Sequence, residues 1–171
     1  MRPILTPPPP ALSLHLADEA ATLAFGAQLA SGVRPGMSIH LCGELGAGKT
    51  TLARGLIRAL GHEGKVKSPT YSLVELYTVS RLHLYHFDFY RFDGPKAWRD
   101  SGFREHFNAD SVCLVEWPEK AGAALPQPDL RVTLAPASSG RDVTLEAFTE
   151  AGSQCLTCVI DHASGPGCAP G

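Results

Sequence analysis

The sequence has almost no net charge and no long apolar run. Its 171 residues carry a formal net charge of -2, and the pI is about 6.4. A chain without a bulk basic field does not hold a polynucleotide non-specifically, so a nucleic-acid role would need a local patch or a partner. The apolar runs are short, and the start lacks the apolar stretch of a signal peptide. We therefore expect a cytoplasmic protein without membrane association.

Cysteines are few, odd in number and scattered. The five are Cys42, Cys113, Cys155, Cys158 and Cys168. Cys155 and Cys158 form a C-x-x-C pair, but the spacing to the other candidate ligands matches no standard pair of zinc motifs. The segment around them is rich in Gly, Ser and Pro. We therefore predict that residues 150–171 form a reduced, structurally loose tail, and that the Pro-rich residues 1–11 form a flexible or extended one.

A Gly-rich motif is the most informative feature that the sequence does contain. Residues 43–50, Gly-Glu-Leu-Gly-Ala-Gly-Lys-Thr, match the Walker A pattern G-x-x-x-x-G-K-[ST]. The motif follows a predicted strand, Met37 to Cys42, and opens a helix predicted from about Lys49 to Leu60. Its glycines let backbone N–H groups point at an anion, and the helix start adds a positive dipole end. We expect Lys49 to reach the β- and γ-phosphates and the Thr50 hydroxyl to bind Mg²⁺.

Two carboxylates are candidates to complete the magnesium site. A P-loop enzyme needs an acid at the end of a neighbouring buried strand. Glu116 ends the apolar run Val112 to Val115, which is typical of a strand buried on both faces. Asp88 lies near the end of another predicted strand, Leu82 to Tyr90. We assign the metal to Glu116 together with Thr50, and the γ-phosphate side to Asp88, which could orient or activate the attacking water. The alternative for Asp88 is an exposed carboxylate that faces water.

The remaining pattern predicts one α/β domain without internal repeats. A strand and an Ala-rich helix precede the Gly-rich loop, and two hairpins follow it. We interpret His86, beside Asp88, as a hydrogen-bonded structural residue and Trp117 as a packed aromatic. The predicted elements outside the motif are a strand over Leu12 to Leu16, a helix to about Ala30, a hairpin of Ser72 to Val79 with Leu82 to Tyr90, helical pieces over Pro95 to about Phe107, and a hairpin of Leu130 to Leu134 with Val143 to Phe148.

The sequence leaves more than one class of nucleotide protein open. It contains neither the Asn-Lys-x-Asp string nor the Asp-x-x-Gly switch of GTPases, which favours adenine. A small-molecule kinase also joins a P-loop to one compact domain and usually adds an arginine-rich lid. Arg91, Arg99 and Arg104 could supply that lid, although they sit among acidic residues and equally fit a solvated surface. A nucleotide-dependent binding module is the third possibility.

Four motifs, in order and spacing, resemble the TsaE family, formerly YjeE. They are GELGAGKTT from Gly43, VKSPTY from Val66, HFDFYR from His86 and LVEWPE from Leu114. The resemblance covers roughly Leu12 to Phe148, so we place the domain at residues 12–149. It implies an α/β fold: a small P-loop NTPase domain with a mostly parallel central sheet, antiparallel additions and helices on both faces.

The resemblance also implies a function. It points to a Mg²⁺-dependent ATPase of the machinery that makes threonylcarbamoyladenosine in bacterial tRNA, beside the anticodon. The partners of this family are the TsaB and TsaD proteins, and the tRNA is met indirectly through that complex. ATP hydrolysis is implied to support repeated turnover rather than the group transfer itself.

The resemblance assigns roles to residues by position. The metal ligands are Thr50 and Glu116, and the catalytic residues are Lys49, Asp88 and Thr70, the last in a loop resembling a nucleotide-sensing switch. The implied ATP-binding residues are Glu19, Gly43, Leu45, Gly46, Ala47, Gly48, Lys49, Thr50, Thr51, Asp88, Glu119 and Arg141.

Overall fold

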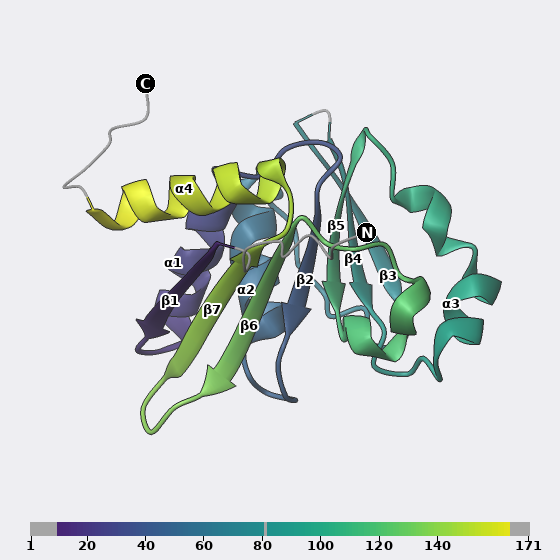
Figure 1. Cartoon of the computed structure of the whole chain (residues 1–171), viewed down its shortest axis with the longest axis horizontal. Helices are drawn as coiled ribbons and strands as arrows, with labels where there is room; N and C mark the ends of the chain where they lie inside the picture. The colour runs from purple at the N-terminus through teal and green to yellow at the C-terminus, as the bar shows by residue number, and fades with distance from the viewer. Residues whose placement is uncertain (1–9, 81, 165–171) are drawn as a thin grey trace, which may run out of the picture.

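Strands from both ends of the chain join one seven-stranded sheet in the order β1-β7-β6-β2-β5-β4-β3 (Figure 1). The computed structural model describes residues 10–80 and 82–164. The strands are β1 (Ala11–Leu16), β2 (Ser38–Cys42), β3 (Val74–Val79), β4 (Leu82–Asp88), β5 (Ser111–Glu116), β6 (Leu130–Pro136) and β7 (Arg141–Ala147). The α-helices are α1 (Glu19–Ala30), α2 (Lys49–Ala59), α3 (Pro95–Ser101) and α4 (Glu150–Ser164).

The sheet has a parallel middle and antiparallel borders, as expected. β2 pairs in parallel with both β5 and β6, and β4 pairs in parallel with β5. The predicted hairpins form as antiparallel pairs, β3 with β4 and β6 with β7, and β1 closes the far side against β7. The strand nearest the Gly-rich loop therefore lies in the centre of the sheet, with a neighbour on each side.

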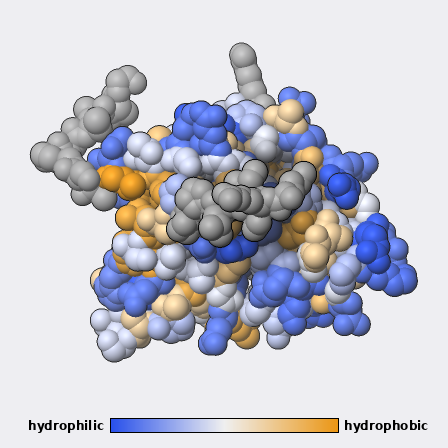
Figure 2. Space-filling model, viewed as in Figure 1, coloured by the Kyte–Doolittle hydropathy of each residue, from blue (hydrophilic) through white to orange (hydrophobic). Residues whose placement is uncertain are grey.

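Helices cover both faces of the sheet, which confirms another expectation. On one face, Phe25 of α1 and Leu52 of α2 pack in the main core with strand residues such as Ile39 and Leu114. On the other face, Trp98 of α3 belongs to a second, largely aromatic cluster with Phe87, Phe89, Cys113 and Val115. Hydrophilic side chains gather over the outer surface of α3 in Figure 2. No helix in the described part of the chain is long and apolar enough to cross a membrane.

Two glycines let α1 and α2 cross in backbone contact. A Cβ atom at Gly26 would clash with the carbonyl of Leu52, and one at Gly55 would clash with the carbonyl of Leu23. Only residues without a side chain fit where helix backbones approach this closely. The crossing fixes α2 against α1 and so sets the position of the first turn of α2, which carries Lys49 and Thr50.

The prediction of a loose tail from residue 150 is wrong for Glu150–Ser164, which forms α4. Cys155, Leu156 and Val159 of this helix are buried in the main core, and the helix contacts α1 and β7. Burial raises the pKa of the Cys155 thiol to about 11, so the thiol form is favoured. Gly and Ser in the segment suggested a loose chain, but the apolar side chains on one face of the helix outweigh their low helix propensity. Residues 1–9 and 165–171, including Cys168, lie outside the described residues.

Candidate functional site

The ends of three neighbouring strands place the two predicted carboxylates beside the Gly-rich loop. Leu41 of β2 lies opposite Glu116 of β5, and Glu116 lies opposite Asp88 of β4. These strands are parallel, so their carboxyl ends meet at one edge, the edge where ligands bind in open α/β sheets. The loop leaves β2 at the same edge, directly after Cys42. The register thus brings together groups that are far apart in the sequence.

A cavity of about 320 Å³ lies over the Gly-rich loop. Its lining includes most of the residues expected to bind ATP. The lining residues are Glu19, Leu45, Gly46, Ala47, Gly48, Lys49, Thr50, Thr51, Glu116, Trp117 and Arg141. α2 begins after Gly48, whose φ of 106° is in the left-handed region, and in the described structure no side chain caps this end. The first N–H groups of a helix have no intrahelical acceptor, so this end of α2 suits an anion.

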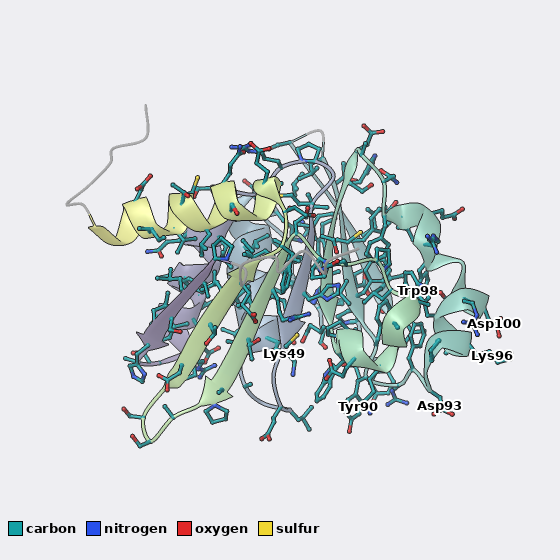
Figure 3. The ribbon with its side chains drawn as sticks, in the orientation of Figure 1. Lys49, Tyr90, Asp93, Lys96, Trp98 and Asp100 are labelled. Atoms are coloured by element: carbon teal, nitrogen blue, oxygen red, sulfur yellow. The ribbon has the colours of Figure 1, made fainter. Side chains whose placement is uncertain are left out.

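Lys49 is a buried cation held by backbone carbonyls. Its side chain projects at the loop end of β2 (Figure 3) and is 5% exposed. Its Nζ donates to the carbonyl oxygen of Gly43 and, at 3.0 Å, to that of Glu44, and it lies 4.0 Å from the centre of the Trp117 ring. Burial lowers the pKa of Lys49, while the nearby carboxylates, led by Glu116, oppose that shift. A desolvated ammonium of this kind would be stabilised by an anion in the cavity.

Thr50, Glu116 and His86 form a connected polar group. The Thr50 hydroxyl donates to Glu116 Oε1 at 3.0 Å, with Oε2 at 3.3 Å. His86 Nε2 lies 2.6 Å from Glu116 Oε2. Glu116 is 2% exposed, and both its oxygens and the Thr50 hydroxyl are hard donors of the kind that Mg²⁺ prefers. The two residues predicted to share a metal are therefore in direct contact.

Asp88 is buried, so the alternative of a carboxylate that simply faces water is wrong. It is 5% exposed, and burial raises its pKa above the usual range, although the Tyr90 N–H bond opposes the shift. Asp88 Oδ1 accepts from Tyr90 N at 2.9 Å, and Oδ2 accepts from the Thr70 hydroxyl at 3.3 Å. Ser68 Oγ lies 2.8 Å from Thr70 Oγ1. The loop that carries Thr70 is thus attached to Asp88, one strand away from Glu116.

The turn between β6 and β7 brings Arg141 to the loop cavity. Arg141 Nη1 donates to the carbonyl oxygen of Ala47 at 3.2 Å. The preceding Gly140 has a φ of 65°, and a Cβ atom there would clash with the carbonyls of Leu16 and Ala17. The turn is therefore packed against the junction of β1 and α1, the same junction that carries Glu19. This packing explains why two residues from opposite ends of the domain line one cavity.

Three predicted ATP contacts, Gly43, Asp88 and Glu119, do not line the loop cavity, and Glu119 lines another one. It is exposed on the short 3₁₀ turn Pro118–Lys120 and lines a second cavity of about 420 Å³ together with His40, Cys42 and Arg131. Pro118 follows Trp117, whose left-handed backbone (φ 58°) redirects the chain after β5. Glu119 therefore lines a different cavity from Glu116, although its charge is among those that act on Lys49.

Sequence reasoning missed two residues that the structure brings into the site. Trp117 lines the loop cavity and stacks against Lys49, and His86 contacts Glu116. Position was the available signal for both. Trp117 directly follows a carboxylate at a strand end, and His86 lies two residues before Asp88, which places the two side chains on one face of β4.

The fold and the site define a mixed α/β protein whose Gly-rich loop, at the end of a central parallel strand, lies beside carboxylates from two neighbouring strands. The family model described as threonylcarbamoyl adenosine biosynthesis protein TsaE matches residues 16–143. The chain belongs to the TsaE family, which confirms the resemblance of the four motifs.

Relatives and a solved structure resemble the chain over most of its length. The tRNA threonylcarbamoyladenosine biosynthesis protein TsaE of Haemophilus influenzae is 40% identical over 151 residues, which cover 85% of this chain and 96% of the relative. The protein of the same name from Bacillus subtilis is 37% identical over 127 residues, covering 74% and 79%. The crystal structure of YdiB from Bacillus subtilis superposes with a TM-score of 0.80 at 28% identity and covers 93% of this chain and 100% of that one.

Proposed function

We propose that this protein is a cytoplasmic, Mg²⁺-dependent ATPase with a P-loop NTPase fold that serves tRNA threonylcarbamoyladenosine biosynthesis. Its ATP hydrolysis would support the turnover of a TsaB–TsaD complex, through which it meets tRNA. The observation that carries the proposal is the convergence of Lys49, Thr50 and Glu116 on one cavity over the Gly-rich loop. Membership of the TsaE family supports the pathway.

The residues around the loop fit a nucleotide with magnesium. Lys49 and the N–H groups at the start of α2 would bind the phosphates, because Lys49 is a buried cation and the helix start carries unpaired donors beside the same cavity. Thr50 and Glu116 would hold the metal, since a hydroxyl and a carboxylate already in contact suit a small, hard cation. Bound magnesium supplies positive charge that offsets the charge on the β- and γ-phosphate oxygens.

Asp88 and Thr70 would act on the γ-phosphate side. Asp88 lies opposite Glu116 in the strand register, so it is one strand removed from the proposed metal ligand. There it would orient or deprotonate the attacking water. Its hydrogen bond with Thr70 links this acid to the loop from Val66 to Tyr71, so a change at the γ-phosphate would be transmitted to that loop.

A small-molecule kinase finds less support. Its arginine lid would use Arg91, Arg99 and Arg104, all of which are exposed. Arg91 stacks on the exposed ring of Tyr71 at 4.4 Å, and Arg99 lies on the hydrophilic surface of α3. Among the described residues, the arginine that lines the loop cavity is Arg141.

The test measures ATP consumption and tRNA modification with the purified chain alone, with TsaB–TsaD alone, and with all three together. We expect TsaB–TsaD to stimulate hydrolysis, and repeated rounds of modification to require this chain and ATP. Lys49→Ala serves as the control without phosphate binding. Phosphorylation of a small acceptor by the chain alone, or repeated modification without it, would contradict the proposal.

A further inference from the structure

The ring of His86 contacts Glu116, the residue that we place at the metal. The side chain is fully buried on β4, with 0% exposure, and its Nε2 lies 2.6 Å from Glu116 Oε2. An ionised carboxylate can only accept a hydrogen bond, so the ring must carry its proton on Nε2. Nδ1 is buried and has no hydrogen-bond partner among the described residues. Among the described residues, Glu116 is therefore the hydrogen-bond partner of this ring.

The contact with His86 makes the two oxygens of Glu116 different from each other. Oε2 accepts from His86 and is the more distant oxygen from the Thr50 hydroxyl, at 3.3 Å. Oε1 is the nearer oxygen, at 3.0 Å. A carboxylate bonded through one oxygen loses rotational freedom about its terminal torsion, which is otherwise broad. The His86 bond therefore leaves Oε1 directed toward Thr50.

From this arrangement we infer that His86 is a positioning residue that orients Glu116 for magnesium, an inference that rests on the proposed function. Partners behind a metal-binding side chain fix its orientation, and their loss typically costs 10–100-fold in metal affinity. The strand pairing suits the role, because His86 and Glu116 lie on adjacent parallel strands inside the sheet and both side chains are buried. The ring is thus held by the core rather than by a mobile loop.

A purely structural role would give a different result. If His86 only satisfied a buried carboxylate, its loss would lower the stability of the fold or the binding of nucleotide as a whole. If it orients Glu116, its loss must weaken the response to magnesium while leaving magnesium-free nucleotide binding unchanged. The two roles are therefore separated by measuring nucleotide affinity with and without the metal.

The experiment titrates Mg²⁺ into each variant in the presence of a fluorescent ATP analogue, and measures analogue binding in EDTA in parallel. We expect His86→Leu to raise the Mg²⁺ concentration at half effect by about 10-fold or more, with binding in EDTA changed less than about 2-fold. His86→Gln should recover most of the loss, because its amide N–H can donate where Nε2 does. His83→Leu, an exposed histidine on the same strand, is the matched control and should behave as wild type.

His86→Asn keeps the test decisive should His86→Leu fail to fold. Its shorter amide resembles Nδ1 rather than Nε2, so we expect it to lose Mg²⁺ affinity while His86→Gln retains it. An unchanged Mg²⁺ titration in His86→Leu, or equal losses with and without the metal, would overturn the inference alone. If nucleotide binding by the wild-type protein did not depend on Mg²⁺, the proposed function would be overturned as well. Failure of the inference and failure of the proposed function are therefore distinguishable.

Discussion

At the scale of single residues, the site concentrates charged side chains that the fold removes from water. Lys49, Asp88 and Glu116 are each 5% exposed or less. Burying a charge is costly unless it is paired, so each has a partner: carbonyls for Lys49, hydroxyl and amide hydrogens for Asp88, and a hydroxyl and an imidazole for Glu116. These hydrogen bonds stabilise the buried charges in the absence of a ligand.

Asp88→Asn tests the proposed role of Asp88 in hydrolysis. The amide has nearly the same shape, but it cannot take a proton from water. We expect ATP affinity to change less than about 3-fold and steady-state hydrolysis to fall by about 100-fold or more, the usual contribution of a general base. Equilibrium binding of an ATP analogue and phosphate release are the two measurements. Asp93→Asn, an exposed acid beyond the end of the same strand, is the control. Unimpaired hydrolysis in Asp88→Asn would show that Asp88 does not activate the attacking water.

At the scale of elements, the crossing of α1 and α2 is the contact that sets the loop helix in place. Gly26→Ala should destabilise the protein although Ala is the better helix former. Propensity alone favours the change by up to about 1 kcal/mol, but the new methyl group meets the Leu52 carbonyl, which cannot rotate away. Overpacking of this kind costs about 1–3 kcal/mol. We expect a net loss near 1 kcal/mol, or roughly 2–4 °C in Tm.

The matched control for Gly26→Ala lies on the exposed side of the same helix. Ala27→Gly changes propensity without packing, and we expect it to cost about 1 kcal/mol. Thermal unfolding followed by circular dichroism measures both variants. A Gly26→Ala protein that is more stable than wild type would show that the two helices can separate at this point.

Local sequence patterns predicted most of the helices and strands, but not every packing contact between them. Alternation and capping predicted β1 and α1, and the Walker A spacing predicted the start of α2, because these signals lie within a few residues. α4 was missed because its helix depends on packing of Cys155 and Val159 against the sheet and α1. The His86–Glu116 contact depends on which strands become neighbours. No short stretch of sequence contains that information.

At the scale of the whole molecule, a buried histidine should make stability depend on pH. Burial, aided by the charge of Arg131, lowers the pKa of His40 from its ordinary value of 6.5 to about 4. The His40 ring therefore becomes protonated below about pH 6.5 in the unfolded chain, but only below about pH 4 in the folded protein. The contribution of neutral His40 to the free energy of unfolding is fully present above pH 6.5. It is lost as the pH falls from 6.5 to 4, by roughly 3 kcal/mol.

His40→Leu should remove that part of the pH dependence. We expect the free energy of unfolding in urea to fall less steeply between pH 6.5 and pH 4 than in wild type. At pH 7 the variant should be at least as stable, since the buried His40 Nε2 has no hydrogen-bond partner among the described residues. The exposed His83→Leu should keep the wild-type slope. Parallel curves for His40→Leu and wild type would contradict the assignment.

The strand order also governs when the protein can become functional during translation. β2 leaves the ribosome early, yet its two neighbours are β5 and β6, and Arg141 follows later still. Contacts between segments so distant in sequence form slowly and only once both segments exist. Until β5 has emerged, both edges of β2 lack their native strands, and one edge still lacks its strand until β6 follows. The nascent chain therefore carries its Gly-rich loop for most of its synthesis before the site around that loop can be completed.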